Sequence, residues 1–298
     1  MKVLLAVSGG IDSMYMAERA PELFPGASFA VAHCNFCLRG EESDGDEAFV
    51  RDWCSRKGMP LFVRRFDTSA YAREEHLSIE MAARELRYAW FGELCREEGF
   101  DKVAVAHNAD DNAETFLLNL VRGAGTRGLR GMESHGLILR PLLGIPRQEI
   151  REWMEERGLP WREDSSNASP AHKRNRLRNE VIPVLKELNP SLLRTIANDT
   201  GHIRQVDDIA DEYFASVRDS VFDGRMISVP KLLELKHPRY VLFRLVEPVA
   251  LTQTALDNLW EGVSSGRQLG GRVFVGKRGS VRGRAKWKLE VVIIDKSC

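Results

Sequence analysis

Residues 3–13 read Val-Leu-Leu-Ala-Val-Ser-Gly-Gly-Ile-Asp-Ser, an uncharged apolar run that ends abruptly in small and polar residues. The run predicts a buried strand that leads into a phosphate loop. Gly9 and Gly10 let the backbone approach a ligand closely, and a helix that starts near Ser13 would point its unpaired N–H groups at an anion. The predicted loop comprises Ser8, Gly9, Gly10, Ile11, Asp12 and Ser13.

This loop differs from a Walker loop, because no Lys precedes its final Ser. The charge of a bound phosphate must therefore be met by metal ions and by Arg or Lys from elsewhere. Asp12 is placed to hold a cation or to orient a nucleophile. The run Ser-Gly-Gly-Ile-Asp-Ser resembles the pyrophosphate-loop signature of enzymes that split ATP between the α and β phosphates and adenylate an oxygen. That resemblance implies a reaction class and no substrate.

Length and composition favour a cytoplasmic protein with two domains. The 298 residues suffice for one sizeable core and a smaller second domain. Lys plus Arg and Asp plus Glu number 43 each, so the formal net charge of zero argues neither for nor against a nucleic-acid partner. The five cysteines, without a signal peptide, fit a reduced compartment better than a disulfide scaffold. The first apolar run is too short for a transmembrane helix, so we expect no membrane association.

The hydrophobic pattern of the first half predicts a doubly wound parallel α/β sheet. Apolar strands alternate with amphipathic helices, which is the repeating unit of such sheets. We expect strands at 3–7, 28–33, 60–66, 102–107 and 137–143, and helices at 14–20, 41–57, 79–98, 110–121 and 147–157.

The sequence becomes polar and basic after Trp161, and Asn189-Pro190 interrupts the helical pattern. We therefore predict a catalytic domain at 1–189 and a smaller, mainly helical domain at 190–298. The second domain should hold a long helix at 191–217 that is interrupted at Asp199, followed by helices at 238–246 and 252–263. Alternation around 276–283 predicts that the tail forms a β-hairpin.

Acidic side chains follow the predicted fourth strand. Parallel sheets bind ligands at the carboxyl ends of their strands, and this strand delivers Asp111 and Glu114 to that edge. The two residues are three apart and share a helix face, where they could coordinate Mg²⁺ on a triphosphate. The alternative interpretation is that they only complement the dipole of the helix.

Three further groups each have a functional and a structural interpretation. Glu80, Arg84 and Arg87 lie within two helical turns, although Glu80 and Arg84 also fit a surface ion pair. The glycine-rich basic segment 122–131 suits a polyanion or a mobile surface loop. Cys34 and Cys37 form a lone CxxC without a second pair at comparable spacing, which favours structural cysteines over a metal site.

Basic residues cluster at two places. One cluster occupies 172–178, and the other spans 263–289 without any acidic residue; its members are Arg267, Arg272, Lys277, Arg278, Arg282, Arg284, Lys286 and Lys288. Two basic patches on a neutral protein indicate a nucleic-acid partner, although the tail could also be a solvated face.

Taken together, these motifs resemble one family, tRNA(Ile)-lysidine synthetase. The resemblance covers about residues 1–190 and rests on segments that occur in the family's order, at 8–13, 33–43, 79–88, 107–115, 140–143, 163–167 and 174–178. Asn112 stands where the family commonly has Gln, and Cys37 replaces a frequent His. The chain is also shorter than many members, so we expect it to lack their extra C-terminal domain and to contact the acceptor stem differently.

The resemblance implies an ATP-dependent modification of the wobble cytidine, position 34, in a tRNA(Ile) with a CAU anticodon. Cytosine O2 attacks the α-phosphorus and pyrophosphate leaves; the ε-amine of L-lysine then attacks C2 and expels AMP. The resemblance implies that His33, Arg87 and His107 bind the nucleotide together with the loop, and that Asp12 and Asp111 hold Mg²⁺.

The implied catalytic residues are Asp12, Asp111, Glu114, Arg174 and Arg178. The two arginines could stabilise charge on the α-phosphate. Free lysine has an amine pKa of about 10.4, so a carboxylate must accept its proton or the site must lower that value. Asp111 and Glu114 are the candidates.

Two alternatives remain open from the sequence. A tRNA thiolase of the same superfamily would use Cys34 and Cys37 to deliver sulfur to an adenylated base. A nucleotide-sensing module without catalysis is the second alternative, and the intact Asp12, Asp111 and Glu114 argue against it. The sequence leaves the oligomeric state open, with a homodimer among the options.

Overall fold

The structure is a computed structural model that describes residues 1–163, 173–224, 226–249 and 251–265, together with the backbone of 279–281, 284–286 and 292–293. Residues 164–167 of the motif predicted at 163–167 and most of the basic tail, including Arg278 and Arg282, lie outside the described residues. The described part of the chain holds no helix that is both long and apolar enough to cross a membrane.

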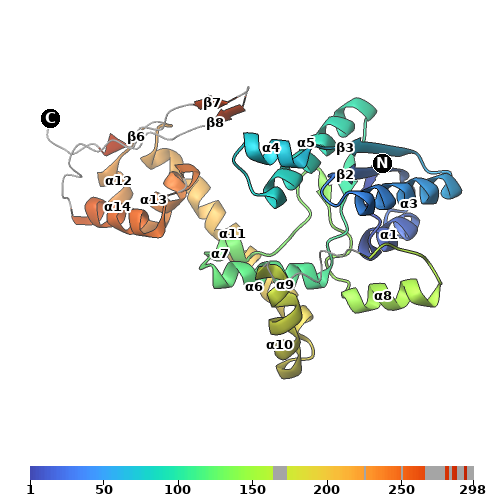
Figure 1. Cartoon of the computed structure of the whole chain (residues 1–298). Helices are drawn as coiled ribbons and strands as arrows, with labels where there is room; N and C mark the ends of the chain where they lie inside the picture. The colour runs from blue at the N-terminus through green and yellow to red at the C-terminus, as the bar shows by residue number, and fades with distance from the viewer. Residues whose placement is uncertain are drawn as a thin grey trace. The chain divides into compact units, whose positions relative to one another are not determined.

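A five-stranded, all-parallel sheet forms the first half of the chain and confirms the predicted fold class (Figure 1). Its order is β3-β2-β1-β4-β5, so the crossover direction changes at β1. Ligands of such sheets bind outside the carboxyl ends of the strands at that change. The strands are β1 (Lys2–Ala6), β2 (Ser28–Asn35), β3 (Leu61–Arg65), β4 (Lys102–Ala104) and β5 (Ile138–Leu139).

Alternate residues of β1 enter two separate cores because successive side chains of a strand point to opposite faces. Val3 and Leu5 pack with α1 (Ile11–Glu18), α3 (Glu41–Lys57) and α8 (Arg147–Glu156). Leu4 packs on the other side with α5 (Ile79–Glu98). The central strand is therefore covered on both faces, which fixes the position of the loop that follows it.

The helix after the phosphate loop begins at Ile11, earlier than the sequence predicts, so Asp12 lies in its first turn. Several short helices escaped prediction. The glycine-rich segment contains α7 (Thr126–Leu129), and Asp67 caps α4 (Thr68–Glu74) by accepting from Ala70 N at 2.9 Å. Two more short helices of this kind are α2 (Ala20–Leu23) and α12 (Val229–Leu233). One-turn helices carry too little periodicity to stand out in a sequence.

The described part of the basic cluster, from residue 173 onward, is helical. It runs through α9 (Lys173–Arg176), a π-helical turn (Leu177–Val181) and α10 (Ile182–Leu188), and it packs against α6 (Ala109–Val121). Arg174 and Arg178 are four residues apart, so they share one face of this segment.

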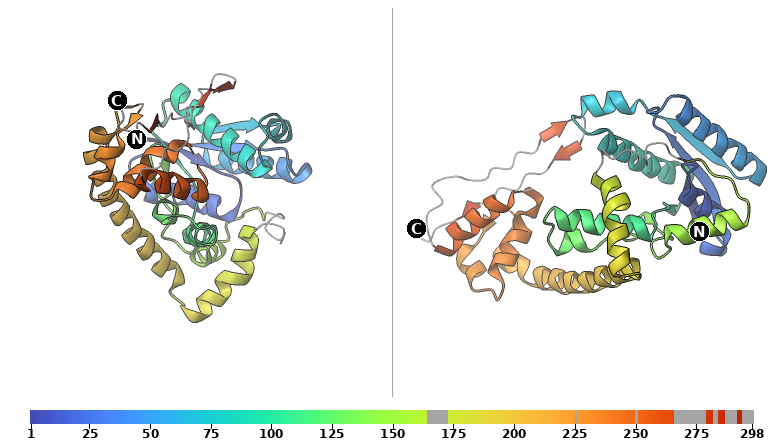
Figure 2. Two further views of the ribbon diagram at one scale, coloured as in Figure 1. Left: turned by 90° about the vertical axis from the view of Figure 1, so that its left-hand side faces the viewer. Right: turned by 60° about the horizontal axis from the view of Figure 1, so that its bottom comes forward.

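The long helix α11 (Leu192–Val221) is continuous, and the predicted interruption at Asp199 is wrong (Figure 2). Thr200 satisfies its hydroxyl within the helix by donating to Ala197 O at 2.9 Å, and Ile196 and Thr200 are buried. Tertiary packing therefore outweighs the poor helix propensity of Asp199, Thr200 and Gly201.

The chain divides into two compact units, 1–204 and 205–298. The boundary between a catalytic and a second domain, predicted between residues 189 and 190, stays a prediction. The second unit contains α13 (Pro238–Val246) and α14 (Gln253–Ser265), which bury Leu242, Leu245 and Leu259. β7 (Gly279–Val281) pairs antiparallel with β8 (Arg284–Lys286), as the predicted hairpin requires, and β6 (Met226–Ile227) pairs with β9 (Val292–Ile293).

Candidate active site

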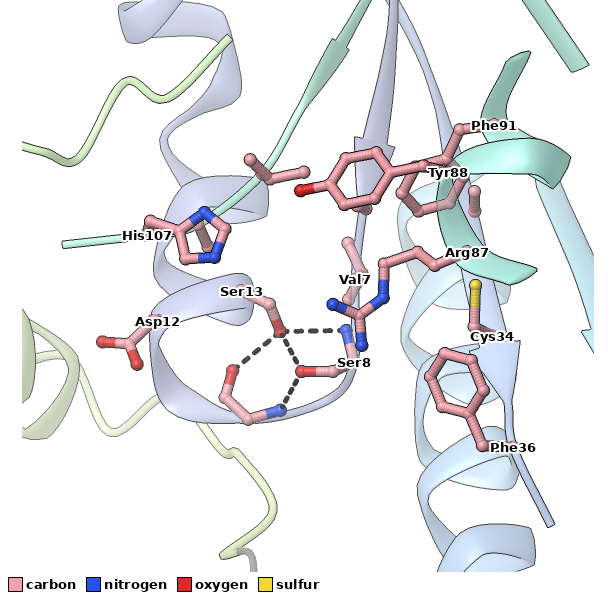
Figure 3. Close-up of a pocket in the computed structure, with 15 residues that line it drawn as sticks. Val7, Ser8, Asp12, Ser13, Cys34, Phe36, Arg87, Tyr88, Phe91 and His107 are labelled. Carbon is pink, nitrogen blue, oxygen red and sulfur yellow. Dashed lines mark hydrogen bonds between the residues drawn. The ribbon is translucent and has the colours of Figure 1, made fainter. Parts of the chain in front are cut away.

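The Ser13 hydroxyl closes the phosphate loop (Figure 3). Its oxygen accepts from Ser8 N at 3.1 Å and from Gly9 N at 3.2 Å, and its proton is donated to Gly10 O at 2.8 Å. Gly9 has a backbone φ of +96°, a conformation that residues with a side chain rarely adopt. Local hydrogen bonds and one glycine thus hold the loop in shape. The first intrahelical bond of α1 is donated by Met14 N, so the earlier N–H groups of that helix face the loop.

A cavity of about 240 Å³ opens on one side of the loop, at the carboxyl ends of β1, β2 and β4 (Figure 3). Apolar side chains such as Phe36 and Phe91 form part of its wall, and Arg87 and His107 add polar groups. The Arg87 guanidinium lies over the Phe36 ring, 5.2 Å from its centroid. This cavity can accept a flat ring and an adjoining anion.

His107 is neutral in this cavity. Burial lowers the pKa of His107 to about 3, and Arg140, Arg174 and Arg87 add to the shift. Within the described part of the chain, His107 Nδ1 and Tyr88 Oη are buried and have no hydrogen-bond partner. Buried polar atoms are normally paired, so both atoms are available to a ligand.

His33 lies against the end of β1. Its Nδ1 lies 2.8 Å from Val7 O, at the end of β1, and burial lowers its pKa. It lines a separate cavity of about 350 Å³ with Ser8, Arg39 and Arg87. His33 therefore supports the backbone that enters the loop, and its role in nucleotide binding stays a prediction.

A second cavity of about 240 Å³ lies on the helix side of the loop and is strongly charged; we call it the polar cavity. It shares Ser8, Gly10 and Asp12 with the first cavity. Its charged lining residues are Asp12, Arg39, Asp46, Asp111, Arg147, Arg162, Glu163 and Arg178.

Asp12 and Asp111 both reach this polar cavity, and Asn108 connects them. Asn108 Nδ2 donates to Asp12 Oδ1 at 3.0 Å, while Asn108 Oδ1 accepts from Asp111 N at 2.9 Å. The Asp111 carboxylate in turn accepts from Asn108 N at 3.1 Å, which completes a capping box for α6. The alternative interpretation, dipole complementation, therefore also applies to Asp111, but Asp111 lines the polar cavity as well, where a ligand could reach it.

The pKa of Asp12 is raised, chiefly because the carboxyl group is buried. The Arg147 guanidinium and the amide of Asn108 oppose that effect, and the charge of Asp111 reinforces it. A buried carboxylate whose ionisation is disfavoured, with a second carboxylate beside it, can receive a cation.

Glu114 is fully buried and anchors two arginines. Its carboxylate accepts from Arg174 Nε at 2.7 Å, from Arg178 Nε at 2.5 Å and from Arg178 Nη2 at 3.0 Å. Both arginines also approach Asp111 Oδ1 at 3.4 Å. The structure thus brings together all five predicted catalytic residues, and Glu114 contacts the arginines with both of its oxygens.

Several site residues were missed by sequence reasoning. Arg162 N donates to Gly9 O at 2.9 Å, and the Asp46 carboxylate accepts from Arg162 Nε at 3.0 Å and from Arg39 Nη2 at 2.7 Å. Asp110 accepts from Arg147 N at 2.8 Å and from Lys186 Nζ at 2.9 Å. Arg39 and Asp46 follow β2, and Arg147 follows β5, so their position after parallel strands was an available signal.

The glycine-rich segment contributes to packing near α6. Asn112 Oδ1 accepts from Met132 N at 2.7 Å, and a Cβ on Gly131 would lie only 2.7 Å from that same oxygen. Asn112 therefore holds a backbone turn. It does not line the polar cavity, so the replacement of the family's Gln by Asn leaves that cavity's lining unchanged.

The two cysteines of the CxxC are unlike a reactive pair. Burial raises the pKa of the Cys34 thiol to about 12, whereas Cys37 is exposed. Among the described residues, no three His, Cys, Asp or Glu side chains are grouped so that they could hold a metal ion.

Comparisons with known proteins identify similar sequences and a matching family. The model of the PP-loop domain family matches residues 1–185. The tRNA(Ile)-lysidine synthase of Parabacteroides distasonis is 41% identical over 88% of this chain, and that of Chlorobaculum tepidum is 48% identical over 70%. The chain spans 60% and 65% of the lengths of these two relatives.

A solved structure supports the fold independently. The U34-tRNA thiolase NcsA from Methanococcus maripaludis, with its 4Fe–4S cluster, superposes with a TM-score of 0.58 and 21% identity over 68% of this chain and 71% of that one. The matched family model covers the sheet, the phosphate loop and the polar cavity. The chain therefore belongs to the PP-loop domain family.

Proposed function

We propose that this protein is a tRNA(Ile)-lysidine synthase. It would ligate L-lysine to C2 of the wobble cytidine of tRNA(Ile) with a CAU anticodon, using ATP. The observation that carries the proposal is the identity of 41% and 48% to curated relatives of that name, over 88% and 70% of this chain. The geometry adds a charged cavity beside the loop in which arginines and carboxylates converge.

ATP would lie across the loop. Its base suits the first cavity, where Phe36 and Phe91 offer apolar surface and His107 and Tyr88 offer unpaired polar atoms. Its phosphates suit the N-terminal N–H groups of α1. Because both cavities share Ser8, Gly10 and Asp12, one nucleotide can reach from the first cavity to the second.

Mg²⁺ fits the polar cavity. It prefers oxygen ligands, and proteins commonly hold it with one or two carboxylates plus substrate phosphates. Asp12 and Asp111 supply two carboxylates on one cavity wall, and the raised pKa of Asp12 reflects the cost of leaving that charge buried. When bound, the ion would neutralise charge on the phosphates.

Arg174 and Arg178 would stabilise the charge that develops on the α-phosphate during attack by cytosine O2. The reaction forms an O–P bond, and pyrophosphate leaves. Glu114 would act as a positioning residue, because it holds both guanidinium groups through side-chain hydrogen bonds. Fixed donors need no reorganisation at the moment of reaction, which is the advantage of such an anchor.

In the second step the lysine ε-amine attacks C2, and the C2–O2 bond to the adenylate breaks with release of AMP. The amine must attack unprotonated. Asp111 lines the polar cavity and its contacts with the two arginines are long, at 3.4 Å, whereas Glu114 is fully buried and both of its oxygens accept from arginines at 2.5 to 3.0 Å. We therefore assign the proton-accepting role to Asp111 rather than to Glu114.

The proposal is tested by incubating the protein with ATP, labelled lysine and total tRNA, followed by nucleoside analysis. Lysidine in one isoleucine tRNA is the expected product. Without lysine, an adenylated tRNA should accumulate, and later addition of lysine should release AMP without further ATP. If AMP appears at the same rate with and without lysine, water or sulfur is the acceptor and the proposal fails.

Two further expectations belong to this proposal. A tRNA-modifying ligase would act in the cytoplasm, where its tRNA and ATP are found. The homodimer that the sequence left open is tested by light scattering of the purified protein at concentrations used in the assay.

A further inference from the structure

Arg147 occupies an unusual position in the polar cavity. It is the first residue of α8, and its backbone N–H donates to the Asp110 carboxylate at 2.8 Å. That bond fixes where the side chain emerges. The half-buried guanidinium lines the polar cavity together with Asp12 and the loop residues Ser8, Gly10 and Ile11.

The other arginines of this cavity are already paired with carboxylates. Arg39 and Arg162 share the two oxygens of Asp46. Arg178 pairs with Glu114 at 2.5 Å and with Asp111 at 3.4 Å. Among the described residues, Arg147 is the arginine of this cavity whose guanidinium makes no hydrogen bond or ion pair.

A half-buried guanidinium that makes no direct hydrogen bond or ion pair loses solvation, and the attraction of nearby Asp12 and Glu163 offsets only part of that loss unless an anion arrives. Arg147 is close enough to Asp12 to oppose the rise in its pKa, yet no direct bond joins the two side chains among the described contacts. The space between them is bordered by the loop. An anion with several oxygens can contact the guanidinium there while facing the carboxylates through a cation.

We infer that Arg147 binds the leaving pyrophosphate, that is, the β and γ phosphates of ATP, on the helix side of the loop. The inference rests on the proposed ATP-dependent reaction. Arg147 supplies the fixed cation that a Walker loop would take from its Lys, and it does so from α8 instead of from the loop. Arginine suits this task because its planar donors match phosphate oxygens two at a time.

A second anion could compete for this assignment, since the α-carboxylate of lysine carries the same kind of oxygens. Position favours the phosphate. Arg147 shares its cavity with Ser8, Gly10 and Ile11 of the loop, which also borders the first cavity. The two sources are separated experimentally, because pyrophosphate and lysine can be titrated independently.

The test is equilibrium binding of pyrophosphate with Mg²⁺, measured by titration calorimetry on the full chain without tRNA. AMP and lysine are titrated in parallel. Arg147→Ala should weaken pyrophosphate binding by about tenfold to a hundredfold, the scale of one charge-assisted hydrogen bond. AMP binding should change less than about twofold, and Arg147→Lys should give an intermediate loss because a point charge replaces a bidentate donor.

Arg157→Ala is the matched control. Arg157 caps the other end of α8 and is exposed. Its guanidinium donates hydrogen bonds to Trp153 O and to the Glu156 carboxylate, outside the polar cavity. This variant should bind pyrophosphate like the parent protein. Thermal unfolding of all three variants shows whether a loss of binding reflects a loss of folding.

Unchanged pyrophosphate binding in Arg147→Ala overturns the inference. A selective loss of lysine binding would reassign Arg147 to the carboxylate, and equal losses for AMP and pyrophosphate would make its role structural. These binding measurements involve no turnover. A chain that binds pyrophosphate through Arg147 but forms no lysidine would therefore disprove the proposed function and leave this inference standing.

Discussion

Asn108 joins Asp12 to the first turn of α6 with a single side chain. Its amide nitrogen donates to Asp12 Oδ1 at 3.0 Å, and its amide oxygen accepts from Asp111 N at 2.9 Å. Asp12 and Asp111 lie in the first turns of α1 and α6, the helices that follow β1 and β4, and these two strands are adjacent in the sheet but far apart in the sequence. The spacing of the two proposed metal-binding carboxylates thus depends on a residue with no charge of its own.

Replacing Asn108 tests this dependence. Asn108→Ala should lower the free energy of unfolding by about 1 kcal/mol, because a helix cap is lost, and should slow pyrophosphate release. Asn108→Ser keeps a capping oxygen but removes the amide donor to Asp12. We expect near-normal thermal stability and slow pyrophosphate release from the Ser variant. A Ser variant with the parent's rate would show that Asp12 does not need the amide.

Asp12→Asn should separate stability from activity. Loss of an electrostatic stabiliser should reduce pyrophosphate release by about 10²-fold or more. The same variant should unfold at a higher temperature at neutral pH, because burial raises the pKa of Asp12 and makes its ionised form costly in the folded state. Differential scanning calorimetry and a pyrophosphate assay measure the two effects. Near-normal pyrophosphate release would remove Asp12 from the catalytic residues.

The sign of the pH dependence follows from the same shift. The folded state binds the Asp12 proton more tightly than the unfolded chain does, so the stability advantage of Asn should be present above the folded-state pKa. It should vanish as the pH falls below about 3.9, where both states are protonated. Melting temperatures of both proteins across pH 3 to 8, measured without metal, test this. An advantage that grows in acid would contradict the assignment.

Glu114 and Arg174 should behave as a coupled pair. Glu114→Gln removes the charge that holds two guanidinium groups, and Arg174→Ala removes one of those groups. Each single variant should slow pyrophosphate release, and the double variant should be little slower than either, since the residues act as one unit. Pyrophosphate release in a double-mutant cycle checks this. Additive losses would mean that Glu114 has a role separate from the arginines.

The effect of Glu114→Gln on AMP release tests the proton-acceptor assignment. The proposed role for Glu114 predicts equal losses in pyrophosphate and AMP release, because the arginines serve the adenylate in both steps. A selective loss of AMP release would instead show that Glu114 steers the lysine amine.

The cysteines offer a test against sulfur chemistry. Burial holds the pKa of Cys34 at about 12, so its thiol stays protonated near neutral pH. Iodoacetamide should therefore alkylate exposed Cys37 well before Cys34, as mass spectrometry of tryptic peptides would show. Cys37→Ser should keep lysine ligation near the parent's rate. Loss of ligation in that variant would revive the thiolase alternative.

The basic tail remains a prediction from sequence. Changing Arg278, Arg282 and Arg284 to Ala should weaken tRNA binding and reduce its salt dependence by about one unit of slope for each lost phosphate contact. Filter binding across a salt titration measures both quantities. Unchanged binding would mean that the tail is only a solvated face.

The fold was predictable where periodicity was strong. The β1 run, the α3 and α5 patterns and the alternation of strands with helices appear as expected, because burial on two faces leaves a clear hydrophobic signature. The break predicted at Asp199 failed for the opposite reason. Local propensity opposed the helix there, and the packing of Thr200 against Gly131, invisible in the sequence, decided the outcome.

The site was predictable as a set of residue types but not as a set of partners. The motif 107–115 identified Asp111 and Glu114, yet it could not show that Glu114 contacts arginines with both oxygens. Asp46 and Arg162 are 116 residues apart, and their contact depends on how α3 and the segment after α8 meet beside the loop. Such pairings depend on tertiary geometry, whereas sequence spacing reports only local neighbours.

The Ser13 hydroxyl network has a thermodynamic consequence for ligand recognition. Because Ser13 already holds Ser8, Gly9 and Gly10 in place, the entropy of ordering the loop is lost when the protein folds and is not lost again when a nucleotide binds. Loop ordering should then add little to the unfavourable entropy of nucleotide binding. Ser13→Ala would move that entropic cost from folding to binding, so that weaker affinity appears as a more unfavourable binding entropy.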